Sequence, residues 1–196
     1  MKNDIILSGV GGQGILSVAA IIGLAATENG LYLKQSEVHG MSQRGGDVQS
    51  HLRLSDKPVF SDLIPYGNAN IIISIEPMES LRYLPWLSTD GWLITNSNPF
   101  NNIQDYPFID DIINEIKKVE NHIILDADSI AKKAGSTRSG NIVILGAASP
   151  FIDMPFESFE NAIRKLFGYK GERIVDINIT ALKAGRELSG DIPKRN

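Results

Sequence analysis

Residues 9–14 read Gly-Val-Gly-Gly-Gln-Gly and match the spacing G-x-G-x-x-G. They follow a short apolar run at residues 5–7 and precede residues 15–29, which carry apolar side chains at helical spacing. Glycines at a strand-to-helix turn let an anion approach the backbone amides, and the helix dipole favours negative charge there. The pattern therefore predicts a site for a phosphate or a carboxylate. A tight turn that binds nothing is the alternative.

A nicotinamide dinucleotide would be a narrower interpretation of the same glycines. Dinucleotide-binding folds place an acidic residue about 20 residues after the glycine loop, at the end of the second strand. Glu37 lies at roughly that distance after Gly14, but within a segment that we expect to be a loop. A stand-alone nucleotide-binding dehydrogenase thus stays an alternative, and tight binding of NAD or NADP would distinguish it.

A second polar segment occupies residues 36–46, Ser-Glu-Val-His-Gly-Met-Ser-Gln-Arg-Gly-Gly. Loops carried by a rigid sheet often hold binding groups. Arg44 could clamp a carboxylate or phosphate, and His39 could move a proton near neutral pH. A solvated loop with ordinary turn glycines is the other interpretation of this segment.

No complete catalytic or metal-binding set accompanies these two segments. The three histidines are far apart in the sequence, and we expect His51 and His122 to be surface or packed residues. The chain has no cysteine, which excludes disulfides, cysteine nucleophiles and thiolate-ligated iron–sulfur clusters within it. Any cluster chemistry would belong to another polypeptide.

Composition narrows the class of protein further. Hydrophobic residues make up 42% of the 196 residues, and the net charge of −4 gives no electrostatic reason to expect a nucleic-acid partner. The apolar stretch at residues 15–26 is too short for a membrane span and lacks a signal-peptide cleavage site. We expect a cytoplasmic protein with no membrane partner.

Strand and helix patterns alternate along the chain, which favours a mostly parallel sheet covered on both faces. Residues 47–55 alternate in polarity and predict a half-exposed, antiparallel strand, whereas residues 141–148 fit either a helix or a strand. Other strands are expected at residues 5–7, 31–35, 70–75, 91–95 and 122–125. Helices are expected at residues 15–29, 77–83, 109–118, 156–167 and 173–188, with one more starting at 126 or 128.

We expect one domain over residues 1–196, since no linker is apparent, and a loose tail at residues 191–196. Residues 96–107, rich in Asn and Pro, predict an exposed loop. Ile177 and Leu182 are the expected core positions of the last helix.

Residues 9–16 and 36–46, in this order and spacing, resemble the gamma-type subunit of 2-oxoacid:ferredoxin oxidoreductases. Within that family, residues 36–46 look most like the beta subunits of indolepyruvate ferredoxin oxidoreductases. Residues 139–147, Ser-Gly-Asn-Ile-Val-Ile-Leu-Gly-Ala, are also similar to a stretch of the family.

The resemblance implies a three-layer α/β/α fold with a mixed sheet and a Rossmann-like start. It implies an enzyme that decarboxylates a 2-oxoacid oxidatively, forms an acyl-coenzyme A thioester and reduces ferredoxin. Thiamine diphosphate and the iron–sulfur clusters would lie on a large partner subunit, and this chain would be inactive alone but able to contact coenzyme A. We also consider a homodimer for the isolated chain.

The resemblance assigns no catalytic residue to this chain. It places two groups of residues at a ligand or at the interface with the partner subunit. These are Gly9, Gly11, Gly12, Gln13 and Gly14 on the glycine loop, and Glu37, His39, Gln43, Arg44, Gly45 and Gly46 on the second segment. A structural scaffold is the remaining alternative, in which bulkier residues at Gly11 or Gly12 would impair folding but not ligand affinity.

Overall fold

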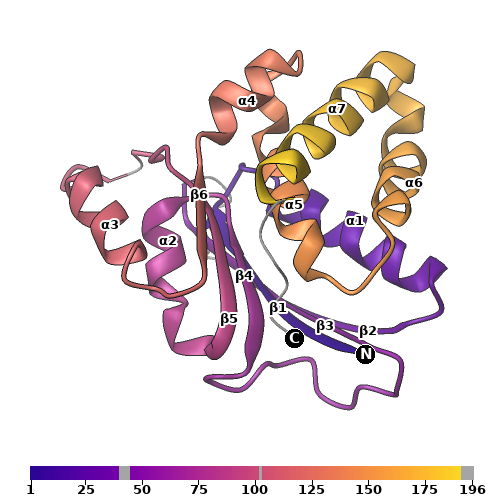
Figure 1. Ribbon diagram of the computed structural model, residues 1–196, viewed down its shortest axis with the longest axis horizontal. Helices are drawn as coiled ribbons and strands as arrows, with labels where there is room; N and C mark the ends of the chain where they lie inside the picture. The colour runs from indigo at the N-terminus through magenta and orange to yellow at the C-terminus, as the bar shows by residue number, and fades with distance from the viewer. Residues whose placement is uncertain (40–44, 102, 191–196) are drawn as a thin grey trace.

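A six-stranded mixed sheet forms the centre of the computed structural model, which describes residues 1–39, 45–101 and 103–190 (Figure 1). The strand order is β2-β3-β1-β4-β5-β6. β3 runs antiparallel to both of its neighbours, and β1, β4, β5 and β6 are parallel to one another. The strands are β1 (Lys2–Val10), β2 (Tyr32–His39), β3 (Asp47–Ser55), β4 (Ala69–Ser74), β5 (Leu87–Asn96) and β6 (His122–Leu125).

Helices cover both faces of this sheet, which confirms the predicted three-layer α/β/α fold (Figure 1). α2 and α3 pack on one face, and α1, α5, α6 and α7 pack on the other. The helices are α1 (Ile15–Glu28), α2 (Pro77–Arg82), α3 (Ile109–Ile116), α4 (Ala127–Lys133), α5 (Gly140–Ala148), α6 (Phe156–Phe167) and α7 (Glu172–Ser189). Short 3₁₀ turns are η1 (Leu84–Trp86), η2 (Thr137–Ser139), η3 (Ser149–Phe151) and η4 (Gly168–Lys170).

The central strand β1 is apolar on both faces because both faces are covered. Ile5 and Leu7 belong to the larger core, beneath α1 and α5, whereas Ile6 belongs to the smaller core beneath α2 and α3. This continuous burial explains why β1 and β4 have uninterrupted apolar runs.

Residues 141–148, which fit either a helix or a strand by sequence, lie in helix α5. All residues of α5 are buried. A helix buried all round shows no amphipathic period, so sequence periodicity could not separate it from a strand. It packs tightly against α7: a Cβ atom on Gly146 would lie 2.0 Å from the Leu182 carbonyl oxygen, and one on Gly185 would lie 2.0 Å from that of Val143. The two backbones therefore touch where these glycines face each other.

Two expectations about single segments need correction, and two others stay untested. β2 extends to His39, so Glu37 lies in a strand and not in a loop, because its backbone pairs opposite Ser50 of β3. Ile177 is only half-buried, whereas Leu182 of the same helix is fully buried. The expected tail at residues 191–196 falls outside the described residues, and the single domain over 1–196 stays a prediction.

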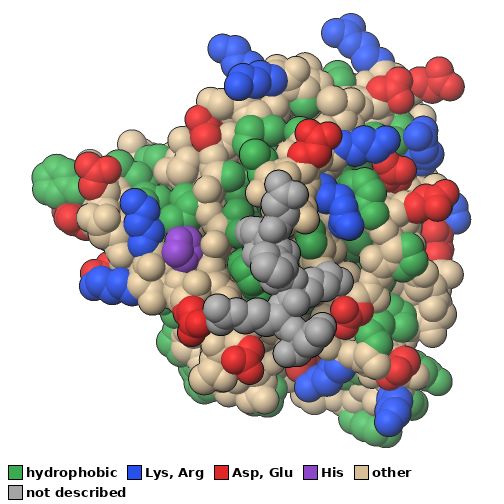
Figure 2. Space-filling model, viewed as in Figure 1, with side chains coloured by type: hydrophobic (Ala, Val, Ile, Leu, Met, Phe, Trp, Pro, Cys, Tyr) green, Lys and Arg blue, Asp and Glu red, His purple; other side chains and the backbone are tan. Residues whose placement is uncertain are grey.

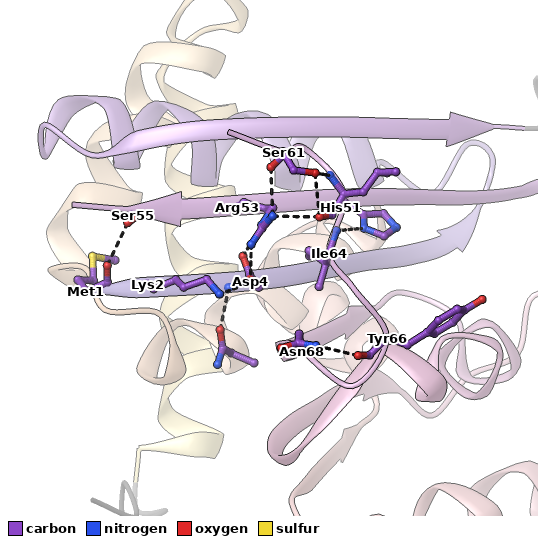
Figure 3. A network of polar contacts seen from close by, with 12 residues as sticks. Met1, Lys2, Asp4, His51, Arg53, Ser55, Ser61, Ile64, Tyr66 and Asn68 are labelled. Carbon is purple, nitrogen blue, oxygen red and sulfur yellow. Dashed lines mark hydrogen bonds and ion pairs between the residues drawn. The ribbon is translucent and has the colours of Figure 1, made fainter. Parts of the chain in front are cut away.

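The antiparallel course of β3 is confirmed, but its polar face is less exposed than its alternation suggested. Arg53 forms a partly buried ion pair with Asp4 and donates hydrogen bonds to the Ser61 and Leu63 carbonyls (Figure 3). His51 is a packed residue whose Nδ1 accepts a hydrogen bond from the Ile64 N–H, at 3.0 Å. Burial lowers the pKa of His51, which keeps that nitrogen free to accept. These contacts fasten residues 61–64 over the sheet.

The surface carries charges of both signs. On the face shown in Figure 2, basic and acidic side chains are interspersed and form no large area of one sign. Among the described residues, no helix is both long and apolar enough to cross a membrane.

We predict that Gly146→Ala and Gly185→Ala each lower the free energy of unfolding by roughly 1–3 kcal/mol or more, because the added methyl group must separate α5 from α7. Urea titration followed by circular dichroism measures this change. Gly168→Ala is the matched control, since it has a negative φ and no atom within 4 Å of an added Cβ. Equal effects of all three substitutions would disprove the close-packing argument.

Candidate functional site

A cavity of about 990 Å³ lies at the edge of the sheet where the carboxyl ends of the parallel strands meet. Its lining includes Gly12 and Gly14 after β1, Ile75 after β4, and Asn96 and Asn98 at the end of β5. The chain leaves β1 toward α1 on one face and leaves β4 toward α2 on the other. Crevices at such a change of direction are the usual ligand sites of open α/β sheets.

The glycine loop presents the first turn of α1 to this cavity. Gly12 and Gly14 have φ angles of 102° and 81°, which side chains other than glycine rarely adopt. No side chain caps the start of α1, and the Gln13 side chain turns back so that its Oε1 accepts the Val10 N–H at 2.8 Å. The Ser17 N–H already donates to the Gly14 carbonyl at 3.0 Å, which leaves the Ile15 and Leu16 N–H groups of the first turn for an anion.

The second segment contacts the glycine loop through its last two residues, Gly45 and Gly46. The Gly11 N–H donates to the Gly46 carbonyl at 2.8 Å, and the Gly45 N–H donates to the Gly11 carbonyl at 3.3 Å. The two sequence-predicted segments are therefore in contact. This contact gives Gly11, Gly45 and Gly46 a role in holding the loop.

Two other predicted residues, Gly9 and Glu37, do not line the cavity. Gly9 belongs to β1, where an added Cβ would lie 2.8 Å from Gln13 Oε1. Glu37 is half-buried on β2 and does not line the cavity. The His39 backbone ends β2, but its side chain lies outside what the structure describes, as do Gln43 and Arg44. The contribution of these three side chains stays a prediction.

A second helix N-terminus faces the same cavity. Asn141, in the first turn of α5, is buried, and its Nδ2 donates to the Gly14 carbonyl at 3.0 Å. No side chain caps α5 at Ser139, which lines the cavity with Gly140. Two helix dipoles therefore direct partial positive charge at one space.

Basic side chains add to this positive potential. Arg138, Lys170 and Arg173 line the cavity, and none of them forms an ion pair with a described residue. The Lys170 ammonium lies 5.3 Å from the centre of the Phe167 ring. One acidic residue, Asp128, also lines the cavity. The site suits an anion larger than a single phosphate.

The wall near Phe100 is anchored by a buried carboxylate. Glu76, at the start of α2, accepts hydrogen bonds from the Phe100 N–H at 3.3 Å and from the Tyr106 hydroxyl. Burial, and then the bond to Glu76, raise the pKa of Tyr106. Tyr106 therefore stays a hydrogen-bond donor and holds the loop after β5 in place.

Sequence reasoning missed the basic residues and the role of Asn141. The similarity of residues 139–147 to a family stretch pointed to the right segment but assigned no contact. Lys170 and Arg173 carry no spacing signal, because only the packing of η4 and α7 brings them to the cavity.

A model of the family described as pyruvate ferredoxin/flavodoxin oxidoreductase matches residues 4–188. The chain belongs to this family. Indolepyruvate oxidoreductase subunit IorB of Archaeoglobus fulgidus is 41% identical over 194 residues, which cover 94% of each chain. IorB of Methanothermobacter thermautotrophicus is 36% identical over 94% of this chain and 96% of its own.

Solved structures agree with this membership. Pyruvate oxidoreductase subunit PORC of Thermotoga maritima matches with a TM-score of 0.70 and 25% identity, over 95% of this chain and 96% of that one. 2-Oxoglutarate:ferredoxin oxidoreductase of Magnetococcus marinus has a TM-score of 0.77 at 19% identity. It matches all of this chain but only 32% of its own, and at that identity it shows the fold alone.

We predict that Gly14→Ala destabilises the chain by roughly 1–3 kcal/mol from its backbone conformation, and by more because its Cβ would lie 2.5 Å from Asn141 Nδ2. Asn141→Ala should remove the clash and the destabilisation that it causes. Gly14→Ala should therefore cost less stability in the Asn141→Ala variant than in the wild type, which a double-mutant cycle measures. Gly12→Ala is the control, having a positive φ but no atom near an added Cβ. Strictly additive effects of Gly14→Ala and Asn141→Ala would contradict the contact.

Proposed function

We propose that this chain is the small, non-catalytic subunit of a thiamine-diphosphate-dependent 2-oxoacid:ferredoxin oxidoreductase that acts on indolepyruvate or another arylpyruvate. The observation that carries the proposal is the likeness to IorB subunits over almost the whole of both chains. The complete enzyme would convert the oxoacid to an acyl-coenzyme A and pass electrons to ferredoxin in the cytoplasm. Whether the isolated chain forms a homodimer stays a prediction.

The redox centres of such an enzyme do not fit the residues of this chain. It has no cysteine to ligate an iron–sulfur cluster, and its described residues contain no group of three potential metal-binding side chains. We therefore assign the clusters and thiamine diphosphate to a larger partner subunit. In ketoisovalerate oxidoreductase subunit VorA of Methanothermobacter thermautotrophicus, the matching region is only 35% of the chain, which supports a larger assembly around this fold.

Coenzyme A fits the cavity through its negative charges. The N–H groups at the start of α1 that carry no other hydrogen bond, and the Arg138, Lys170 and Arg173 side chains, would hold its phosphate groups. When bound, coenzyme A supplies the thiol that accepts the acyl group. The Magnetococcus marinus enzyme, which shares this fold, has been solved with coenzyme A bound.

The dehydrogenase alternative is less well supported. A nicotinamide dinucleotide would need an acidic side chain at the end of the second strand, facing the cavity, to hold the ribose. Asp128, which lines the cavity, lies in α4 after β6. Glu37, which the sequence offered for this role, lies on β2 opposite Ser50 and does not line the cavity.

Reconstitution tests the subunit role. We predict that the chain and the large subunit together reduce ferredoxin in the presence of indolepyruvate and coenzyme A, and that neither does so alone. The reason is that this chain completes the walls of a site whose reactive groups lie on the partner. Activity of the isolated chain, or full activity of the partner without it, would refute the proposal.

In the reconstituted complex, we predict that Lys170→Ala and Arg173→Ala each raise KM for coenzyme A about tenfold, because one charge-assisted phosphate contact is lost. KM for the oxoacid should stay unchanged. Lys118→Ala is the control, since Lys118 follows α3 and forms an exposed ion pair with Glu115. An unchanged KM for coenzyme A in both variants would place coenzyme A outside this cavity.

A further inference from the structure

One aromatic side chain lines the cavity without taking part in the packing of the fold. Phe100, in the loop after β5, is 43% exposed and belongs to neither hydrophobic core. Its ring makes no aromatic contact with a described residue. A phenylalanine this exposed contributes little to stability, whereas aromatic rings in ligand sites commonly supply a flat apolar contact. Phe100 is therefore available to a ligand.

The loop that carries Phe100 is fastened on both sides. The Phe100 N–H donates to the buried Glu76 carboxylate at 3.3 Å. Two residues earlier, Asn98 Nδ2 donates to Asp126 Oδ1 at 2.6 Å and to Asp128 Oδ2 at 3.1 Å. The loop thus needs little ordering when a ligand arrives, which lowers the entropic cost of binding.

The rest of the lining favours a ligand with negative charges. Ser139, directly before α5, is 3% exposed and lines the cavity, and its hydroxyl forms no hydrogen bond with a described residue. Arg138, Lys170 and Arg173 belong to the same lining. A ligand that uses both parts of the cavity must combine a flat ring with anionic groups. The volume of about 990 Å³ has room for both.

We propose that Phe100 stacks on the adenine ring of coenzyme A, while the basic side chains hold phosphates of the same half of the molecule. The inference rests on the proposed function, which supplies coenzyme A as the ligand. Among the substrates of that function, only coenzyme A joins a flat ring to several phosphate groups. Indolepyruvate has a ring and one carboxylate, and its reaction needs the thiamine diphosphate that we assign to the partner subunit. The thiol arm of coenzyme A would then extend from the cavity toward the partner.

The first test measures binding to the isolated full chain by isothermal titration calorimetry. The probe is adenosine 3′,5′-bisphosphate, which reproduces the adenine, ribose and 3′-phosphate of coenzyme A, and inorganic pyrophosphate is the probe without a ring. Phe100→Ala and Phe100→Leu should each weaken binding of the nucleotide roughly tenfold and leave that of pyrophosphate unchanged, because only the nucleotide offers a face for stacking. Phe100→Trp should retain the wild-type affinity.

Phe108→Ala is the matched control, since Phe108 ends the same loop, is 82% exposed and does not line the cavity. It should change neither affinity. No binding of the nucleotide to the wild type, an unchanged affinity in Phe100→Ala, or an equal loss for pyrophosphate would overturn the proposal. Displacement of the nucleotide by indole-3-acetate, if Phe100→Ala abolished it, would also overturn the proposal, because the ring would then serve the oxoacid.

Failure of the proposed function would give a different result. A reconstituted mixture that does not reduce ferredoxin would refute the subunit role, while the nucleotide titration would still report on Phe100. In an active complex, Phe100→Ala should raise KM for coenzyme A roughly tenfold and leave KM for pantetheine 4′-phosphate, which has no adenine, unchanged. An active complex in which both KM values rise equally would overturn the stacking alone.

Discussion

The hydrogen bond from the Asn141 side chain to the Gly14 carbonyl joins two helix N-termini that are distant in the sequence. On the other side of the loop, Gly11 is bonded to Gly45 and Gly46. The glycine loop is thus held from both sides and cannot relax away from the cavity. Preorganised amides of this kind bind an anion without the cost of ordering a flexible loop.

That arrangement depends on how α5 is placed. α5 is buried all round, and Gly146 and Gly185 allow it to approach α7 at backbone distance. The same helix pair brings Arg173 of α7 and the uncapped start of α5 to one cavity. The packing of the helical layer and the charge of the site therefore have a common structural origin.

Most of the fold could be predicted from the sequence because its signals are local. A few neighbouring residues are enough to predict the β-branched strand β4, the amphipathic helix α6 and the glycine turn before α1. α5 could not be assigned, because complete burial removes periodicity. The end of β2 was missed because pairing with β3 outweighed the polar composition of residues 36–39.

Only the part of the site that has a local sequence pattern could be predicted. The glycine loop has a local spacing, whereas Asn141, Lys170 and Arg173 reach the cavity through tertiary packing. A structure of the reconstituted complex with coenzyme A is the most direct test of the account. Phosphate groups lying between the N-termini of α1 and α5 are the predicted result. A cavity filled by side chains of the partner, with coenzyme A bound elsewhere, would contradict it.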